Sequence, residues 1–345
     1  MRTRLTHWPG RLAPHLLFLI PELLMAAGPF VITATATSGA RTRFRMPDFF
    51  YGGQALIEGV MMRGRTTVAM SVRPPSGEIR TYSEALPAAL ARGRWLKIPF
   101  VRGVLVLYEA LVIGTRMLMR SAAIAAEGED VQIGKGTLAV TMIVSLGLAV
   151  GLFFVLPLFL STFAQTATAS DLLANLAEGA IRLTIFVAYI SLVGLTAEIR
   201  RVFAYHGAEH KAISAHEAQR PLTPEEVDQF STAHTRCGTT FLLIVVVISI
   251  FFFGFVPRSG VPLPLLFLSR IVLVPVIAGV AYELVRFGAR HYGNRLVRAL
   301  YAPGLWLQAL TTRPPDRSML EVSIASLESC LASDREGSVP ASPIQ

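Results

Sequence analysis

The sequence predicts a mainly α-helical membrane protein with about four transmembrane helices, a small β-rich N-terminal cytoplasmic piece and interfacial amphipathic helices. Composition is the first indication, since 52% of the 345 residues are hydrophobic and only 16% are charged, whereas soluble domains carry about 25% charged residues. The apolar residues also gather in long runs, which is typical of bilayer spans rather than of a globular core. Finally, basic residues concentrate in alternate connections between these runs, as they do on the cytoplasmic side of membrane proteins.

These runs divide the chain into seven segments. We expect an N-terminal extension (1–49), a cytoplasmic β-hairpin with an amphipathic helix (50–136), two transmembrane helices (137–199), a cytoplasmic His-rich segment (200–238), two further transmembrane helices (239–285), cytoplasmic interfacial helices (286–332) and a disordered tail (333–345). The extension has a basic start, an apolar middle interrupted by prolines, and small residues at its end. A secretory signal, a membrane-associated segment and an artefact of start-site assignment all fit this pattern.

A β-hairpin is predicted after the extension. The stretch TTVAMSV (66–72) alternates apolar and polar residues, PPSG (74–77) is turn chemistry, and EIRTY (78–82) returns as a second strand. The preceding YGGQALIEGVMMRG (51–64) is rich in glycine. We favour glycines required by turns and bulges, with Met61 and Met62 as core residues, over a ligand-binding loop.

The segment 98–126 has the pattern of a long helix. Arg102, Glu109, Arg116 and Arg120 recur at about helical spacing and make one face largely cationic. A helix lying among lipid headgroups and a packed core helix of the cytoplasmic domain both explain this pattern.

Four apolar runs follow that are long enough to cross a bilayer, which takes about 20 residues. They are residues 137–164, 181–199, 239–256 and 264–285. The last run contains Arg270, which we expect to reach the membrane surface or to contact another span. The connection 165–180 has no Lys or Arg, whereas the segments flanking the other ends are rich in arginine. The positive-inside rule therefore predicts that both termini and the central connection are cytoplasmic.

The stretch YHGAEHKAISAHEA (205–218) holds three of the seven histidines of the chain. On a helix, His206, Glu209 and His210 fall at i, i+3 and i+4 and share one face. Two imidazoles at this spacing can bind one zinc ion, with the adjacent glutamate as general base, in the H-x-x-E-H order of inverzincin proteases. The alternative is a polar helix surface that is simply solvated.

Other ionisable residues are expected at a similar depth, at the cytoplasmic ends of the spans. His234 and Cys237 precede the third span, Glu283 lies near the inner end of the fourth, and Glu198 near the inner end of the second. Ionisable groups at membrane depth are candidates for function. Each also has a structural explanation, as an ion pair with a nearby arginine, a helix cap or a packing residue. We expect Cys237 and Cys330 to be reduced, because two cysteines in unlike contexts do not form a disulfide framework.

Several blocks of this sequence resemble the bacterial YqhQ family. They are GGQALIEGVMMRG (52–64), HGAEHKAISAHEA (206–218), STAHTRCGTTFLLIVVVISI (231–250), LVPVIAGVAYELVR (273–286) and APGLWLQALTTRPPD (302–316), in this order along the chain. The resemblance implies a multi-pass protein of the bacterial inner membrane. It also implies a metal-dependent enzyme, which is how the family has been labelled on prediction.

We therefore predict a metal-dependent hydrolase with zinc, or another divalent metal, at the cytoplasmic face. His206 and His210 would be ligands, Glu209 the general base or a ligand, and Glu283, His234 or Cys237 the third ligand. The first alternative is a scaffold whose basic cytoplasmic part binds anionic lipids or a membrane-protein partner; the second is an ion transporter or sensor. No aromatic–basic motif suggests nucleic-acid binding.

Overall fold

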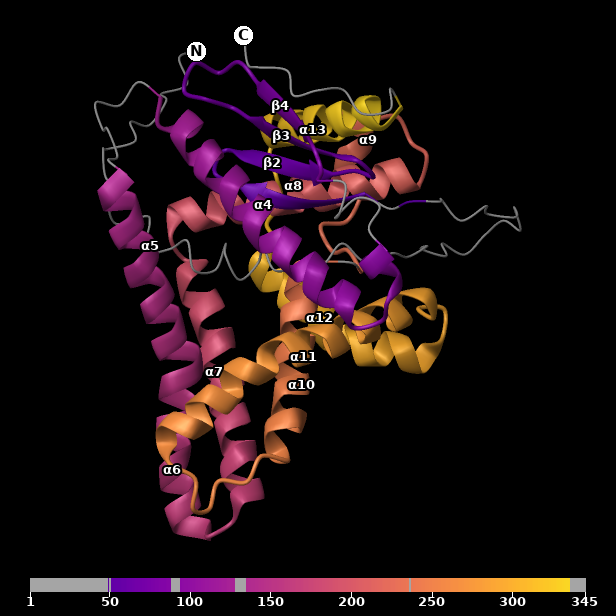
Figure 1. The fold of residues 1–345 in the computed structure, drawn as a ribbon. Coiled ribbons are helices and arrows are strands. Elements are labelled where there is room, and N and C mark those ends of the chain that lie inside the picture. Colours follow the sequence, from indigo (N-terminus) through magenta and orange to yellow (C-terminus); the bar gives the residue numbers. More distant parts are fainter. Residues whose placement is uncertain (1–48, 50, 88–93, 128–134, 236, 336–345) are drawn as a thin grey trace.

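The computed structural model describes residues 49, 51–87, 94–127, 135–235 and 237–335, and the N-terminal extension therefore lies almost wholly outside it. The structure has two parts (Figure 1). The sheet unit consists of a β-sheet with helices α4, α8, α9 and α13. The helical bundle consists of α5, η3, α6, α7, α10 and α11, and α12 lies at the junction of the two parts.

The sheet is a four-stranded antiparallel meander in chain order. Its strands are β1 (Gly52–Leu56), β2 (Gly59–Arg63), β3 (Thr67–Val72) and β4 (Arg80–Ala85). The predicted hairpin of β3 and β4 is present, and the register pairs Met70 with Tyr82. The glycine-rich stretch before it forms two more strands, so Gly52, Gly53 and Gly59 lie in strands rather than in turns. The prediction that turns and bulges require these three glycines was wrong.

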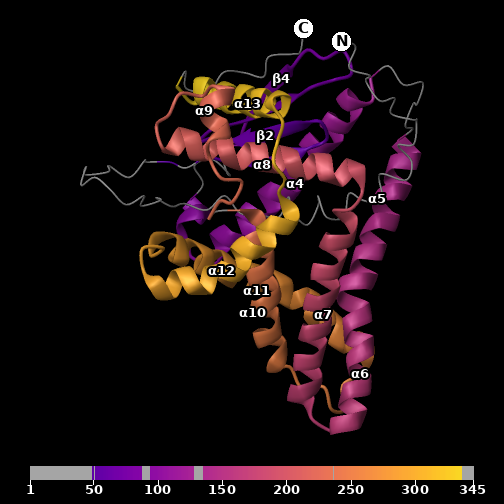
Figure 2. The same cartoon turned by 180° about the vertical axis from the view of Figure 1, so that it is seen from behind.

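Both faces of this small sheet are covered by helices, which explains why its residues are apolar on both sides. Met62 and Ala69 pack against α8 (Ala197–Glu217) and α13 (Arg317–Arg335). Met61 and Met70 face the other side, where α4 (Val101–Ala125) supplies its own apolar residues. In Figure 2, which views the molecule from the side opposite to Figure 1, α8 and α13 lie in front of the sheet. Helix α8, with its three histidines, thus packs directly against one face of the sheet.

Helix α4 is a packed helix that joins the two parts. Ile113, Met117 and Leu118 are buried against the sheet. Its cationic residues are engaged by the protein, since Arg102 pairs with Glu283 of α11 and Arg116 with Glu84 of β4. The structure therefore favours the packed core helix over a helix that lies free among headgroups.

Three helical segments of the described chain are long and apolar enough to cross a membrane: Val140–Thr168, Asp171–Val193 and Leu263–Gly288. The first combines α5 (Lys135–Val150), the π-helical turn η3 (Gly151–Val155) and α6 (Leu156–Thr168); the others are α7 (Asp171–Val193) and α11 (Leu263–Arg290). Helix α10 (Gly238–Gly254), the third predicted span, is apolar but shorter. Helix α12 (Arg295–Thr311) exposes Trp306, as expected of an interfacial helix.

The second predicted span is shifted along the chain. We expected residues 181–199, but α7 begins at Asp171, where the Ser170 side chain caps its first turn, and ends at Val193. A turn then starts α8 as a separate helix. The shift brings Glu178 into the bundle, which the sequence prediction had assigned to an external connection.

Glu178 is the centre of a buried arginine network, which we define as Glu178, Arg182, Arg258 and Arg270. The Glu178 carboxylate is fully buried and accepts hydrogen bonds from all three arginines, at 2.6 to 3.1 Å. Arg270 thus contacts another candidate span, which is one of its two predicted fates. The network ties α7 to α11 and to the connection that carries Arg258, although the sequence analysis gave the bundle no such polar interior.

Side chains cap the N-termini of α9 and α13. Helix α9 (Pro224–Asp228) is capped by Thr223, whose side chain accepts from the backbone N–H of Glu226. Helix α13 is capped by Asp316, whose carboxylate accepts from the backbone N–H of Met319. Its last residues, 333–335, were expected to be disordered but are helical, and Asp334 binds the backbone N–H of Arg65. The remainder of the tail lies outside the described residues.

Candidate metal centre

Helix α8 brings His206 and His210 to one face, as the i, i+4 spacing predicts. The two rings are adjacent, with centroids 4.4 Å apart, and both side chains are buried. Cys237, the N-cap of α10, meets them from the other side, and its Sγ lies 3.2 Å from Nε2 of His206. We call His206, His210 and Cys237 the His–Cys group; one ligand atom from each lies within 4.8 Å of the others.

Backbone carbonyls orient both imidazoles of the His–Cys group. Nδ1 of His206 lies 2.9 Å from the carbonyl oxygen of Thr311, and Nδ1 of His210 lies 2.5 Å from that of Thr232. Because a carbonyl oxygen only accepts, Nδ1–H donates in each ring and Nε2 carries the lone pair. A histidine that ligates a metal typically donates its other N–H in this way.

The same burial keeps the imidazoles neutral. Desolvation lowers the pKa of His206, His210 and His234 below the ordinary histidine value, although the charge of Glu209 acts in the opposite direction at His206 and His234. A neutral imidazole is the form that binds a metal ion. The buried histidines are therefore in the protonation state that a metal centre needs.

His234 and Glu209 lie at the edge of the His–Cys group. The ring centroid of His234 is 5.5 Å from that of His210, and its Nε2 lies 3.6 Å from a carboxylate oxygen of Glu217. The backbone of His234 is held at both ends by the side-chain amide of Gln308. Glu209 is buried, and its Oε2 lies 3.5 Å from Nε2 of His210. The structure thus brings five of the predicted site residues together.

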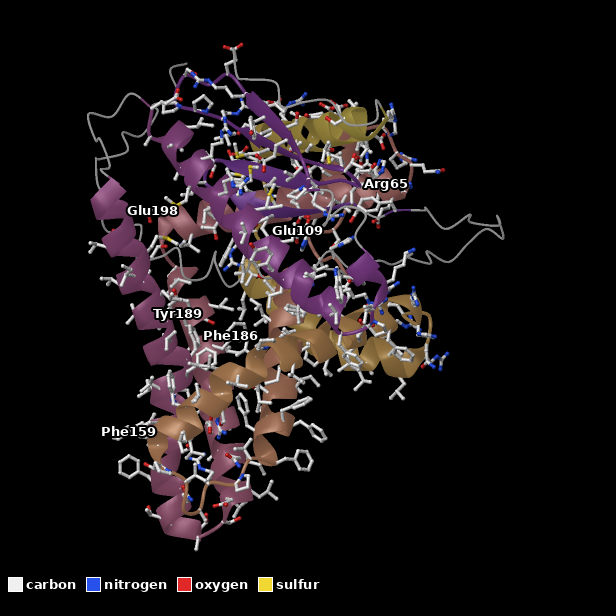
Figure 3. All side chains as sticks on the ribbon, viewed as in Figure 1. Arg65, Glu109, Phe159, Phe186, Tyr189 and Glu198 are labelled. Atoms are coloured by element: carbon white, nitrogen blue, oxygen red, sulfur yellow. The ribbon has the colours of Figure 1, made fainter. Side chains whose placement is uncertain are left out.

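Glu283 stands apart from them. Its carboxylate is bound by the guanidinium of Arg102 and by the backbone N–H of Phe100, so it serves the contact between α4 and α11. Glu198 is also distant, in the first turn of α8 and two helical turns before His206 (Figure 3). Neither carboxylate joins the His–Cys group in the described structure, because Glu198 lies two turns away along α8 and Glu283 is held by Arg102.

Comparison with known proteins gives a family for this arrangement. Residues 98–333 match the family model described as a protein of unknown function, DUF1385. The chain is also 31% identical over 294 residues to the "Uncharacterized protein YqhQ" of Bacillus subtilis (strain 168), covering 81% of this chain and 92% of that protein. The chain belongs to the YqhQ family. No solved structure matches it.

The glycine-rich block of this YqhQ-family chain reaches the candidate site, which the sequence analysis missed. A Cβ added to Gly53 of β1 would lie 2.6 Å from Cγ of Glu209 and 2.7 Å from the carbonyl oxygen of Met61. Gly53 therefore gives the Glu209 side chain its place against the sheet. The sequence did contain a signal for this contact, because a glycine inside a strand often marks a site that another group approaches closely.

The Gly53→Ala substitution is expected to lower the free energy of unfolding by about 1–3 kcal/mol, because its methyl group has no space. Thermal unfolding of the detergent-purified variant measures this loss. The matched control is Gly147→Ala in α5, where nothing lies within 4 Å of the added Cβ. Equal melting temperatures for the two variants would show that Gly53 is not needed to accommodate Glu209.

Proposed function

We propose that this YqhQ-family protein is a multi-pass membrane protein with a cytoplasmic-face metal centre that hydrolyses its substrate. The observation that carries the proposal is the convergence of His206, His210 and Cys237, from two elements distant in sequence, on one buried point. Buried polar groups usually have a structural partner. Here Nε2 of His206 lies 3.2 Å from the Cys237 sulfur, and one ligand atom from each of His206, His210 and Cys237 lies within 4.8 Å of the others, which favours a metal ligand set.

The donor chemistry fits zinc. Two imidazole nitrogens and one cysteine sulfur are ligands that zinc prefers, and three protein ligands leave a fourth position, as in catalytic zinc sites. His206, His210 and Cys237 would hold the ion between them. His234, whose ring centroid lies 5.5 Å from that of His210, is a further imidazole at the edge of the group. Glu283, which the sequence also offered, is taken by Arg102.

A bound divalent ion would lower the pKa of a water molecule to about 7. Glu209 is the residue that would take the proton from this water, onto Oε2, the atom that lies 3.5 Å from Nε2 of His210. A buried carboxylate next to the nucleophile is suited to this role, and it would pass the proton to the leaving group. His206 and His210 would remain oriented by the carbonyl groups of Thr311 and Thr232 throughout.

We place the protein in the bacterial inner membrane with both termini in the cytoplasm. The arginine-rich segments support this orientation through the positive-inside rule, and the sheet unit joins the same ends of the spans. We also count α10 as a fourth span. Its 17 residues give a length of about 25 Å, slightly less than the roughly 30 Å of a bilayer core.

Helix α12 supports a lipid surface as a partner. Leu296, Leu300 and Trp306 are exposed large apolar residues, and the exposed Arg295 and Arg298 lie on the same helix. Such a helix binds the membrane interface through its apolar residues and anionic headgroups through its basic ones. Peptide and lipid-linked substrates both fit a site that lies next to this surface.

The hydrolysis proposal is tested with fluorescein-labelled casein and with 4-methylumbelliferyl oleate as probes, in detergent. We expect zinc-loaded protein to turn over one of them, treatment with 1,10-phenanthroline to abolish the activity, and added zinc to restore it. The Glu209→Gln variant should retain zinc but lose about 10²–10⁴-fold in rate. Glu198→Gln, on the same helix but away from the group, should match wild type. Absence of turnover by zinc-loaded wild type on both probes would overturn the hydrolase assignment.

A further inference from the structure

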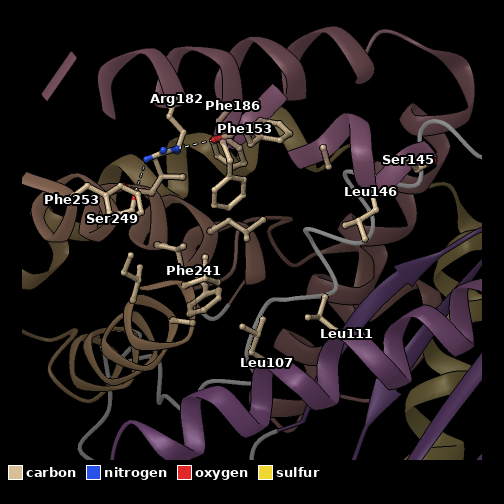
Figure 4. A pocket seen from close by; sticks show the side chains of 18 of the residues that line it. Leu107, Leu111, Ser145, Leu146, Phe153, Arg182, Phe186, Phe241, Ser249 and Phe253 are labelled. Atoms are coloured by element: carbon tan, nitrogen blue, oxygen red, sulfur yellow. Dashed lines mark hydrogen bonds between the residues drawn. The ribbon is translucent and has the colours of Figure 1, made fainter. Parts of the chain in front are cut away.

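The helical bundle has a partly open cavity of about 490 Å³ that plays no part in the proposed hydrolysis. Its volume is within the range of small-molecule sites, about 300–1,000 Å³. Residues from α4, α5, η3, α7, α10 and α11 line it, and apart from Arg182, Ser145 and Ser249 the described lining residues are apolar. Figure 4 shows Arg182 at one end and Leu107 and Leu111 of α4 at the opposite end.

Three aromatic rings surround the charged end of the cavity. The guanidinium of Arg182 lies 4.9 Å from the ring centroid of Phe253 and 5.8 Å from that of Phe154, and Phe153 also lines this end. The π-helical turn η3 provides two of these rings and the Phe153 carbonyl oxygen, which accepts from Nε of Arg182 at 2.9 Å. Such turns occur frequently at functional sites.

The hydrogen bonding of Arg182 leaves donor capacity toward the cavity. A guanidinium has five N–H donors. In the described structure, Nε donates to Phe153, Nη2 donates to Glu178 at 2.6 Å, and Nη1 lies 3.5 Å from the Ser249 hydroxyl. The last distance exceeds the usual 2.7–3.2 Å of such hydrogen bonds. Nη1 of Arg182 therefore keeps donor capacity at this end of the cavity, whereas the Ser249 hydroxyl donates to the Val246 carbonyl oxygen at 2.7 Å.

The charge balance of the arginine network points to an anion at this position. The three arginines face the Glu178 carboxylate, and the Asp171 carboxylate binds the backbone N–H groups of Arg258 and Ser259 at the edge of the network. Three guanidinium groups and two carboxylates leave one positive charge. A buried charge without a counter-ion is costly, and Arg182 is the member of the network that lines a cavity.

We propose that the cavity binds a long-chain fatty acid, with its carboxylate at Nη1 of Arg182. A single negative charge balances the network. A single hydrocarbon chain matches the apolar walls formed by residues such as Phe186, Phe241 and Leu146. Because all the surrounding helices except α4 are those that we place in the membrane, the bilayer supplies such a ligand directly. The site is separate from the His–Cys group and does not depend on hydrolysis.

The test uses a photoactivatable fatty acid with wild-type protein in lipid nanodiscs, and the cross-linked peptides are mapped by mass spectrometry. We expect saturable labelling of peptides from α5–η3 and α10. Oleate should compete at about tenfold or more lower concentration than oleyl alcohol, because a charge-assisted hydrogen bond to Arg182 favours the carboxylate. Equal competition by the acid and the alcohol, or labelling that does not saturate, would overturn the proposal.

Substitutions at two places test separately the binding of the hydrocarbon chain and the binding of the carboxylate. Ala149→Phe places a ring in the cavity and should reduce labelling, whereas Ala180→Phe on the exposed side of α7 should leave it unchanged. Arg182→Gln should remove the preference for oleate over oleyl alcohol. Each variant is compared after size-exclusion chromatography, so that only folded protein is scored. Equal labelling of the two phenylalanine variants, or a preference kept by Arg182→Gln, would contradict this site.

Discussion

The double variant His206→Ala/His210→Ala is expected to lose bound transition metal by at least about tenfold relative to wild type, which we expect to carry about one ion per chain. Removing even an outer partner of a metal ligand typically costs 10–100-fold in affinity, and this variant removes two of the three members of the His–Cys group. Elemental mass spectrometry of the detergent-purified proteins measures the ratio directly. Zinc is the metal expected from the donor set.

The matched control is His216→Ala on the same helix. His216 is half-buried and its ring contacts Tyr51 edge-on, two helical turns beyond the His–Cys group. The His216→Ala variant should purify with the same metal content as wild type. A wild-type protein that holds no transition metal, even after incubation with zinc, would refute the metal centre. The scaffold explanation would then be preferred, and with it sensitivity to changes at Arg102 or Arg116.

The second large effect is expected at Glu178. The Glu178→Ala substitution should cost about 3–5 kcal/mol of stability, since removing one partner of a buried ion pair leaves uncompensated charge. Here three guanidinium groups lose their shared carboxylate at once. We expect little folded Glu178→Ala protein in detergent and a strongly lowered melting temperature. The melting temperature of Glu178→Gln should lie between those of Glu178→Ala and wild type, because the amide keeps a hydrogen-bond acceptor.

Glu226→Ala is the control for this effect. Glu226 also pairs with an arginine, Arg220, but at an exposed site, where an ion pair contributes about 0–1 kcal/mol. If Glu178→Ala melts no lower than Glu226→Ala, the arginine network is not a determinant of bundle stability. That result would also weaken the charge argument for the fatty-acid site.

Patterns with a fixed period were predicted well from the sequence. The apolar runs located most of the bundle, because hydrophobic length is a direct physical requirement of a span. The i, i+4 spacing placed His206 and His210 side by side, because helix geometry fixes it. Even the contribution of Cys237 was expected, since it stands at the entry to an apolar helix.

Features that depend on tertiary contacts were not predicted. Glu178 was assigned to a connection, because only folding brings Arg258 and Arg270 to it and makes its burial possible. Glu283 was offered as a ligand, but its carboxylate meets Arg102 from a helix almost two hundred residues earlier. The role of Gly53 likewise depends on which residue of α8 approaches the strand. The local sequence pattern identifies residues that are unusual for their position, but only the tertiary packing determines which of them are in contact.

The pairing of α13 with the sheet has a consequence for the biogenesis of the protein. The strands lie near the start of the described chain, and the helix that covers one of their faces lies at its end. At about 5–20 residues per second, a ribosome adds the intervening residues in roughly ten to fifty seconds. During that time Met62 and Ala69 lack the contacts with α13 and have only α8 on that face of the sheet. Synthesis of α13 is therefore what completes the cover of the sheet, and a product terminated before α13 would carry a partly exposed apolar sheet face that chaperones and proteases can recognise.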